Sequence, residues 1–432
     1  MAAVNTPSTL NGLYKRVYGK LVNAIPKTGW FLKNVRWDKS HKVGASFHQV
    51  VILTNENGYT YGGSGATAFT LNASVAMGTA PAEVTPFEYV MRCQISYGAV
   101  SRAAQAGPRA FAKAITTVIK NGMESCARRL EVSCIYGSSV DGIGKVASTA
   151  IVDNDSTSFY LVFAEDQWAP GIWIGSEGAI LEAYDEGDAL ETTGGSGDLT
   201  VSQVNFRTRR VLVTAASGLI TQIETKNDTE ALDIYFKGSH DNDMVGIDVI
   251  FQNTTGTIHA ISAATYGLWA GNLFSCNSEA LTHARIMGFA AQLQNRGLED
   301  EDMIVLCNPF TWADLHQEQA ASRVYDESYE NQAAEQGFKA IRYYSPSGWI
   351  RIVASPFVKG GEAFMFPLSV LKRIGSEDRE WKIPGAQEDP WNPIADAAGA
   401  EMRIHSDQTV FCDLPSRCAK IDDIVNNFGT TG

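Results

Sequence analysis

The stretch GPRAFAKAITTVIKNGMESCARRLEVSCIYG, residues 107–137, decides the fold. It opens with Gly107-Pro108, and proline is favoured at the first position of a helix because its missing N–H would have no partner there. Gly137 supplies a stop signal at the other end. The apolar residues between them recur at steps of three and four: Phe111, Ile115, Val118, Ile119, Met123, Cys126 and Leu130. The pattern predicts one helix, about 40 Å long, which Gly122 should weaken or bend.

The end of this stretch carries two cysteines and two adjacent arginines. Cys126 and Cys134 are separated by about 12 Å of helical rise, which is beyond the reach of a disulfide bond. Arg128 and Arg129 lie away from the apolar stripe. They form either a solvated face or an ion pair with a neighbouring subunit, and the sequence leaves both interpretations open.

The residues before the helix divide into two segments. Residues 1–43 are typical of an extended arm, because aromatic and basic residues alternate in LYKRVYGKLVNAIPKTGWFLKNVRW without a clean period. Three aromatic residues of this arm are candidates for docking on another subunit: Trp30, Phe31 and Trp37.

Residues 44–100 predict a long β-hairpin. ASFHQVVILT (45–54) and YVMRCQISYGAV (89–100) are typical of strands, and the segment between them is rich in Gly, Ala and Thr. Because an isolated hairpin is marginally stable in water, we expect this one to lie on another subunit. The candidate contacts near its tip are Tyr59, Tyr61 and Phe69.

The pattern of apolar and turn residues changes twice after the helix. Residues 145–255 are typical of a β-rich region, with short apolar runs set between turn residues. From about residue 260, helical and strand patterns alternate; SEALTHARIMGFAAQLQNRG (278–297) predicts a helix and MIVLCNP (303–309) a buried strand. EMRIHSDQTVFCDL (401–414) predicts a further strand or strand pair near the end.

Composition and charge exclude several classes of protein. Hydrophobic residues make up 44% of the 432 residues, which is typical of a globular protein. A net charge of −13 argues against tight, non-specific nucleic-acid binding, which needs clustered Lys and Arg. The first residues contain no apolar core of signal-peptide length, and no apolar run is long enough to span a membrane. The seven scattered cysteines indicate reduced, buried thiols.

The search for chemistry finds no catalytic, cofactor-binding or metal-ligating residue to name. Walker A, HExxH, GxSxG and GxGxxG motifs are absent from the sequence. SHDNDMVGID (239–248) has Asp241 and Asp243 in the places of calcium ligands, but Val245 stands where a third oxygen ligand belongs. An acidic hydrolase site at Asp185, Glu186 and Asp188 is an alternative, although an exposed acidic loop explains these residues better.

The order of these segments resembles the major capsid protein of tailed double-stranded-DNA bacteriophages, the Hong Kong 97-type fold. An arm, a long hairpin and a long helix ending in CIYG are followed by a β section and an α/β section. ATYGLWAGN (264–272) and GFKAIRYYSPSGWIRIVASPFVKGGEAFMF (337–366) resemble stretches of the same family. The resemblance covers most of the chain and implies an α+β fold with peripheral and axial domains and a β-rich insertion.

The resemblance also implies a division of the chain. The expected parts are an N-terminal arm (1–43), an extended hairpin loop (44–100), a peripheral-domain spine helix (101–145), a β-rich inserted subdomain (146–258), an axial domain (259–395) and a return to the peripheral domain (396–432). No catalytic activity and no cofactor are expected of such a protein.

The implied function is that of a coat protein which assembles into hexamers and pentamers of an icosahedral shell around double-stranded DNA, without sequence specificity and without a membrane. The other expected partners are a portal protein, a separate scaffolding protein and a cement or decoration protein. Some relatives crosslink through a lysine in the extended loop, but this sequence has no lysine between Lys42 and Lys113, so a non-covalent shell is expected. Assembly is expected in the host cytoplasm and the mature protein in the virion. A bacterial encapsulin shell is the alternative with the same fold.

Overall fold

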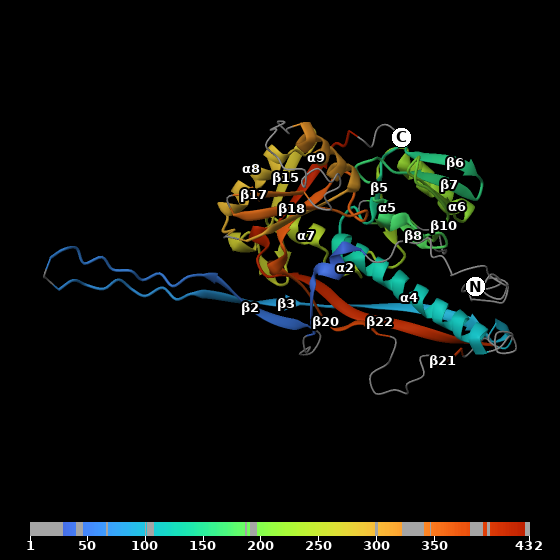
Figure 1. Ribbon diagram of the computed structural model, residues 1–432, viewed down its shortest axis with the longest axis horizontal. Coiled ribbons are helices and arrows are strands. Elements are labelled where there is room, and N and C mark those ends of the chain that lie inside the picture. The colour runs from blue at the N-terminus through green and yellow to red at the C-terminus, as the bar shows by residue number, and fades with distance from the viewer. Residues whose placement is uncertain are drawn as a thin grey trace, which may run out of the picture.

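The computed structural model describes residues 29–39, 46–65, 68–99, 101, 108–185, 188–190, 197–298, 301–321, 341–345, 347–380, 392–394 and 398–427. It contains three larger sheets and a hairpin that projects from them (Figure 1). The mixture of helices and strands confirms the predicted α+β class.

A five-stranded sheet and the long helix α4 form the lower edge of the molecule in Figure 1. α4 runs from Pro108 to Tyr136, as the sequence predicts. The strands run in the order β1-β20-β22-β21, and β4 also pairs with β22. Their bounds are β1 (Arg36–Lys39), β4 (Phe87–Ser96), β20 (Leu371–Glu380), β21 (Asn392–Pro393) and β22 (Gly399–Cys412).

Gly122 has a different role from the predicted one. α4 is continuous through it. A Cβ atom at Gly122 would lie 2.9 Å from Cys93 Sγ and 3.1 Å from Ile404 Cδ1. Glycine at this position therefore lets the helix approach strands β4 and β22 closely, and it does not interrupt the helix.

An eight-stranded sheet follows α4 in the chain and is antiparallel in all its strand pairs. Its strands are β5 (Gly144–Val146), β6 (Ile151–Asp155), β7 (Ser158–Val162), β8 (Ile180–Asp185), β9 (Asp188–Ala189), β10 (Leu199–Asn205), β11 (Arg210–Thr214) and β12 (Leu232–Phe236). Helices α5 (Pro170–Trp173) and α6 (Ser217–Asn227) belong to the same region. Phe163, Trp168 and Trp173 form an aromatic cluster in its core, with ring centroids 5.0–5.9 Å apart.

A six-stranded mixed sheet forms the third unit, in the order β15-β23-β19-β16-β18-β17. Its central strands β16 and β19 are buried along their whole length, which explains their continuous apolar sequences. The strands are β15 (Asn272–Glu279), β16 (Met303–Cys307), β17 (Ile341–Ser345), β18 (Gly348–Ala354), β19 (Ala363–Pro367) and β23 (Ala419–Ile424). The remaining elements of this half of the chain are α7 (Ile247–Gln252), β13 (Thr257–Ile258), β14 (Ile261–Ser262), η1 (Gly267–Trp269), α8 (His283–Gln294), α9 (Pro309–Ala321), η3 (Leu368–Val370) and η4 (Pro415–Arg417).

The projecting hairpin consists of β2 (Phe47–Thr54) and β3 (Gly78–Val84), and its loop extends far beyond the rest of the molecule (Figure 1). The short helix α2 (Trp30–Asn34) precedes it and contacts α4. The predicted hairpin partner, 89–100, is wrong: that segment contains β4, which pairs with β22 over ten residues.

The sequence suggested one boundary at residues 395/396, between the axial domain and the return to the peripheral domain. The strands on either side of this boundary are instead shared between two sheets. β20 lies before that point but pairs with β22 in the five-stranded sheet. β23 lies after it but fills the position between β15 and β19 in the six-stranded sheet. These pairings join residues far apart in the sequence, and an apolar strand pattern does not specify such partners.

Candidate assembly surface

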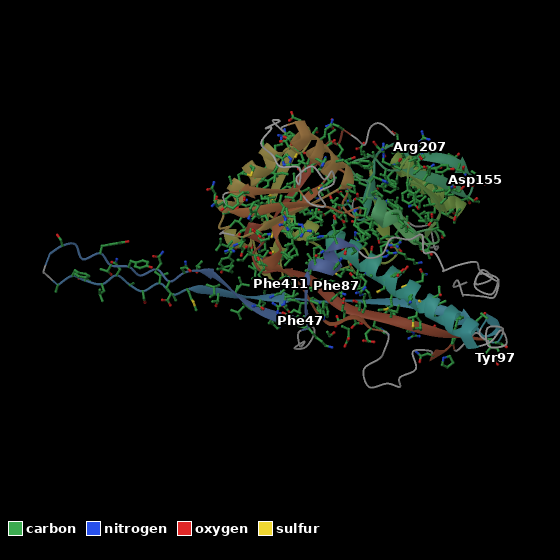
Figure 2. The ribbon with its side chains drawn as sticks, viewed as in Figure 1. Phe47, Phe87, Tyr97, Asp155, Arg207 and Phe411 are labelled. Carbon is green, nitrogen blue, oxygen red and sulfur yellow. The ribbon has the colours of Figure 1, made fainter. Side chains whose placement is uncertain are left out.

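The root of the hairpin is anchored on the body by one face of each strand. Phe47, Val51 and Leu53 of β2 are buried in a cluster that includes Trp269 and Phe411. Figure 2 labels Phe47 and Phe411 where the hairpin meets the five-stranded sheet. Since alternate side chains of a strand point to opposite faces, the other face of β2 is left in solvent. The chain itself therefore fixes the direction in which the hairpin projects.

Hydrogen bonds hold the two sides of the loop together beyond the ends of the strands. The N–H of Asn57 donates to the carbonyl of Val75 at 3.0 Å. The backbone N–H of Asn72 donates to Thr60 Oγ1 at 2.8 Å, and its side-chain amide donates to the carbonyl of Tyr59 at 2.9 Å. The loop is thus a narrow two-sided extension of the hairpin rather than an open coil.

Large apolar side chains of this extension face solvent. The exposed fraction is 91% for Tyr61, 75% for Leu71, 71% for Tyr59 and 54% for Phe69. Further exposed apolar residues on the hairpin are Val50, Ile52, Val75 and Met77. Exposed apolar surface is unfavourable in water, and large patches of it are typical of interaction sites. The three predicted tip residues therefore lie on a surface suited to another protein.

The three predicted contacts in the arm pack against their own chain instead. Phe31 is completely buried, and the ring of Trp30 meets the edge of Phe366 with centroids 6.3 Å apart. Trp37 lies in β1, with the guanidinium of Arg373 5.4 Å from its ring centroid. The prediction of an intersubunit contact is wrong for Phe31, and the main packing of Trp30 and Trp37 is internal. Residues 1–28 of the predicted arm lie outside the described part of the chain.

A buried carboxylate of α4 fixes this segment. The N–H groups of Phe31 and Leu32 donate to the two oxygens of Glu131 at 2.7 and 2.8 Å. Burial raises the pKa of Glu131 to about 7, while the two N–H donors act to lower it. Gly29 is required beside this carboxylate, since a Cβ there would lie 2.0 Å from the Glu131 carboxyl carbon. The start of the described chain is therefore bound near the C-terminal end of the long helix.

The two arginines of α4 face the eight-stranded sheet. Arg128 donates to the carbonyl of Ile174. The Arg129 guanidinium lies 3.0 Å from the ring centroid of Phe236, and burial lowers its pKa to about 10. A solvated face is therefore the wrong interpretation for both side chains, and their contacts with a neighbouring subunit stay a prediction.

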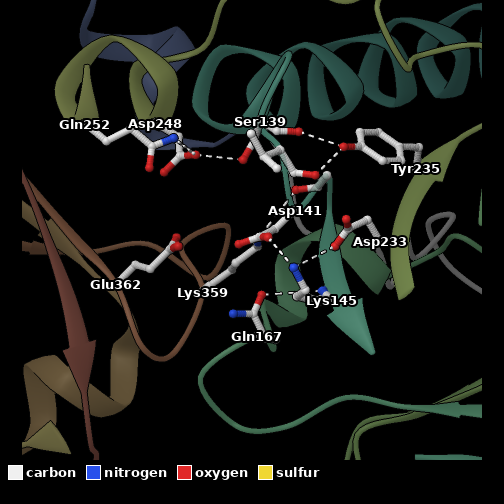
Figure 3. A network of polar contacts seen from close by, with 12 residues as sticks. Ser139, Asp141, Lys145, Gln167, Asp233, Tyr235, Asp248, Gln252, Lys359 and Glu362 are labelled. Atoms are coloured by element: carbon white, nitrogen blue, oxygen red, sulfur yellow. Dashed lines mark hydrogen bonds and ion pairs between the residues drawn. The ribbon is translucent and has the colours of Figure 1, made fainter. Parts of the chain in front are cut away.

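A buried network of charges joins the six-stranded and eight-stranded sheets near the end of α4 (Figure 3). Lys420 of β23 pairs with Asp248 of α7 and, at 2.9 Å, with Glu362 just before β19. Lys359 is 1% exposed, and its Nζ lies 3.4 Å from the carbonyl of Gly142, in the loop after α4. The network thus connects the six-stranded sheet to α7 and to the end of the long helix.

The charges of this junction are stabilised mutually. Burial alone would lower the pKa of Lys420, but Glu362 and Asp248 raise it above its ordinary value, so the ammonium stays charged. Burial would raise the pKa of Glu362, yet Lys420 and Lys359 lower it. Because each buried charge depends on its partners, the junction favours one arrangement of the three units. The sequence does not reveal this junction, since an isolated lysine in an apolar strand carries no signal of its partner.

The junction continues into the eight-stranded sheet through Lys145. Its ammonium pairs with Asp141 at 3.1 Å and with Asp233 of β12 at 3.3 Å. Burial would raise the pKa of Asp141, but Lys359 and Lys145 together lower it. Both carboxylates thus form ion pairs with Lys145, which is typical of a structural role.

The acidic segments singled out in the sequence have structural partners. Asp243 accepts hydrogen bonds from Tyr89 and, at 3.0 Å, from Ser133 of α4. Asp185 pairs with Lys226 at 2.7 Å, while Glu186 lies outside the described residues. Within the described ranges, no cluster of three His, Cys, Asp or Glu side chains could hold a metal ion. No helix of the described residues is long and apolar enough to cross a bilayer.

Comparisons with known proteins find the same fold in a phage capsid structure. No protein-family model and no curated protein sequence matches the chain. Among solved structures, the chain is similar to a protein of the cyanophage A-1(L) capsid asymmetric unit, with a TM-score of 0.53, 12% identity and coverage of 95% of this chain and 96% of that one.

Other capsid structures match at lower TM-scores. The capsid of a native GTA particle matches with a TM-score of 0.48 and 8% identity, covering 98% of this chain and 100% of that one. The capsid of cyanophage P-SCSP1u matches with a TM-score of 0.46 and 10% identity, covering 97% and 95%. The cyanophage A-1(L) match spans nearly the whole of both chains and confirms the fold that the order of segments implied. The chain has the fold of a tailed-phage major capsid protein.

Proposed function

We propose that this chain is a major capsid protein, which assembles through its projecting hairpin into the hexamers and pentamers of an icosahedral shell. The observation that carries the proposal is the loop between β2 and β3, which projects from the body (Figure 1) and whose apolar side chains Tyr61, Phe69 and Leu71 are more than half exposed among the described residues. A second copy of the chain is the natural partner, because a shell places the same body beside every hairpin. The fold shared with a cyanophage capsid protein supports the same function.

Each part of the molecule then has a place in the shell. The five-stranded sheet with α4 corresponds to the peripheral domain, the six-stranded sheet to the axial domain, and the eight-stranded sheet to the inserted subdomain. The hairpin corresponds to the extended loop. The buried junction between the six-stranded sheet, the eight-stranded sheet and the end of α4 would make the subunit rigid, so that interfaces form between preformed surfaces.

The shell would be held by non-covalent contacts through this loop, since the sequence has no lysine between Lys42 and Lys113. The proposed contents are double-stranded DNA bound without sequence preference, and an acidic inner wall suits it because a net charge of −13 disfavours adhesion to phosphate. A portal protein, a separate scaffolding protein and a cement protein are the other proposed partners. Assembly would take place in the host cytoplasm, and the protein would act in the virion without catalysis.

Electron microscopy of the chain, expressed alone and with a scaffolding protein, tests the proposal. Closed icosahedral shells, or rings of five and six subunits, are expected. A small, uniform oligomer under both conditions would contradict the capsid function and favour the hydrolase alternative. Shells that enclose enzymes and exclude DNA would favour an encapsulin instead.

A further inference from the structure

Two buried cysteines meet where the chain crosses between sheets. Cys412 is the last residue of β22 in the five-stranded sheet, and Cys418 directly precedes β23 in the six-stranded sheet. Their sulfur atoms are 3.7 Å apart. We propose that Cys412 and Cys418 are a site of covalent modification, at which an intrachain disulfide forms when the chain meets a low-molecular-weight disulfide such as glutathione disulfide.

The turn between the two cysteines is already folded for this bond. The N–H of Cys418 donates to the carbonyl of Pro415 at 2.9 Å, and the N–H of Arg417 donates to the carbonyl of Leu414 at 3.1 Å. The side-chain amide of Asn272 donates to the carbonyls of Ser416 and Cys418 at 2.8 and 2.7 Å. Since a disulfide needs a sulfur separation of about 2 Å, the two sulfur atoms, 3.7 Å apart in this turn, must approach by about 1.7 Å to form it.

The other cysteines have different neighbours. Cys126 and Cys134 lie on one helix more than two turns apart, and Cys134 Sγ contacts the sulfur of Met244 at 3.9 Å. Cys307 Sγ lies 3.7 Å from the carbonyl of Val353. Burial raises the pKa of the Cys126 thiol, and Cys93 lies close enough to contribute to this shift. Among the described residues, Cys412 and Cys418 are the pair whose sulfur atoms are in direct contact.

Burial makes the reaction slow rather than forbidden. Cys412 and Cys418 are 1% and 0% exposed. Burial, and next the contact with Cys412, raises the pKa of the Cys418 thiol, so little of the reactive thiolate exists at neutral pH. The pair would remain reduced while the chain stays in a reducing cytoplasm. Prolonged exposure to an oxidising solution would convert it through brief local openings.

The reaction is an ordinary thiol–disulfide exchange. The thiolate of one cysteine attacks a sulfur of glutathione disulfide, which forms a mixed disulfide and expels one glutathione thiolate. The thiolate of the second cysteine then attacks the protein sulfur of the mixed disulfide and expels the second glutathione. The two protein thiols are oxidised, the glutathione disulfide is reduced to two glutathione molecules, and the two released protons go to the two leaving thiolates.

The disulfide would tie together the ends of β22 and β23, and so would hold the crossover between the two sheets. In the proposed function, this bond would form only after the shell has left the cell, so its biological timing rests on that proposal. Disulfide formation can be measured on the purified chain whether or not the chain assembles. Failure of the disulfide to form would not contradict the proposed capsid function, and failure of the chain to assemble would not contradict the disulfide.

Tryptic peptide mapping tests the site directly, because Arg417 lies between the two cysteines. Cleavage after Arg403, Arg417 and Lys420 places Cys412 in residues 404–417 and Cys418 in residues 418–420. The chain is purified under reducing conditions, incubated for days with glutathione disulfide at about pH 8.5 to raise the thiolate fraction, alkylated in denaturant and digested without reductant.

The expected product is the linked pair of these two peptides, about 2 Da lighter than their sum, and it should account for most of Cys412. Cys412→Ser and Cys418→Ser should each abolish it, whereas Cys276→Ser, which changes another buried cysteine, should leave it intact. Complete alkylation of both thiols after the incubation, or linkage of either one chiefly to a different cysteine, would overturn the proposal.

Discussion

The hairpin and the six-stranded sheet contain similar apolar residues, but these residues are buried in the sheet and partly exposed in the hairpin. MIVLC in β16 is buried at every position, because β18 and β19 flank it and helices cover the sheet. FHQVVILT in β2 is buried at Phe47, Val51 and Leu53, but Val50 and Ile52 face solvent. The difference is that the chain supplies neighbours on both faces of β16 and on one face of β2. An apolar surface that the described part of its own chain leaves exposed is suited to contact with a second molecule.

Replacing the side chains at the hairpin tip should have the largest effect on assembly while leaving the stability of the subunit nearly unchanged. The triple variant Tyr61→Ser, Phe69→Ser, Leu71→Ser removes exposed apolar area that every subunit contributes to the shell, so shells should be lost. The free energy of unfolding of the monomer should change by no more than about 0.5 kcal/mol, since exposed positions contribute little to folding. Sedimentation velocity measures the first effect and urea denaturation the second.

Val140→Ser is the matched control for this variant. Val140 is 72% exposed but belongs to the body, in the loop after α4. It should leave both assembly and stability unchanged. Loss of shells with Val140→Ser, or persistence of shells with the triple variant, would remove the distinction between hairpin and body.

A substitution in the junction should produce the opposite result. Lys420→Met leaves Asp248 and Glu362 buried without their main cation, which should lower the free energy of unfolding by about 3–5 kcal/mol. Lys237→Met, which breaks the exposed pair with Asp198, should cost no more than about 1 kcal/mol. Urea denaturation gives both values, and equal effects would show that the junction is not the tie between the sheets.

Glu131 predicts a smaller effect that depends on pH. Its pKa is raised from 4.5 to about 7, so the folded chain binds this proton more tightly than the unfolded chain does. The stabilisation is complete below about pH 4.5 and is lost as the pH rises through about 7, on the order of 3 kcal/mol. Glu131→Gln cannot titrate and should remove this part of the pH dependence. An identical pH dependence of the unfolding free energy in variant and wild type would contradict the assignment.

The smallest expected effect comes from Gly62 in the loop. A Cβ at this position would lie 2.3 Å from the ring of Phe69, so Gly62→Ala should displace that ring and weaken assembly several-fold without changing the unfolding midpoint. Gly267→Ala, where a Cβ has no neighbour within 4 Å, is the control that should leave assembly unchanged. Light scattering during assembly measures both rates, and equal rates would show that the position of Phe69 does not matter.

Local patterns in the sequence predicted the long helix and the exposed hairpin tip. Pro108, the apolar repeat and Gly137 define α4 because a helix is stabilised by residues three and four apart. Tyr59, Tyr61 and Phe69 lie in a Gly-rich segment, whose neighbouring residues offer few side chains that could pack on them. All three are exposed.

Pairings between distant residues could not be predicted in the same way. Nothing in FEYVMRCQIS indicates that β4 pairs with β22 rather than with β2, since an apolar strand fits many edges. The contact of Phe31 was misassigned for the same reason: the acceptor for its N–H is Glu131, a hundred positions later. Lys359 and Lys420 appear as ordinary charges until the fold brings carboxylates beside them.

The most direct test of the central claim measures whether the hairpin tip is covered in the assembled protein. All seven native cysteines are buried, so Tyr61→Cys introduces a single exposed thiol. We predict that its alkylation rate falls by about tenfold or more when subunits assemble, which corresponds to a protection of about 1.4 kcal/mol or more, while Val140→Cys serves as a reference on the body. An alkylation rate at Tyr61→Cys that is the same in shells and in free subunits would contradict the account.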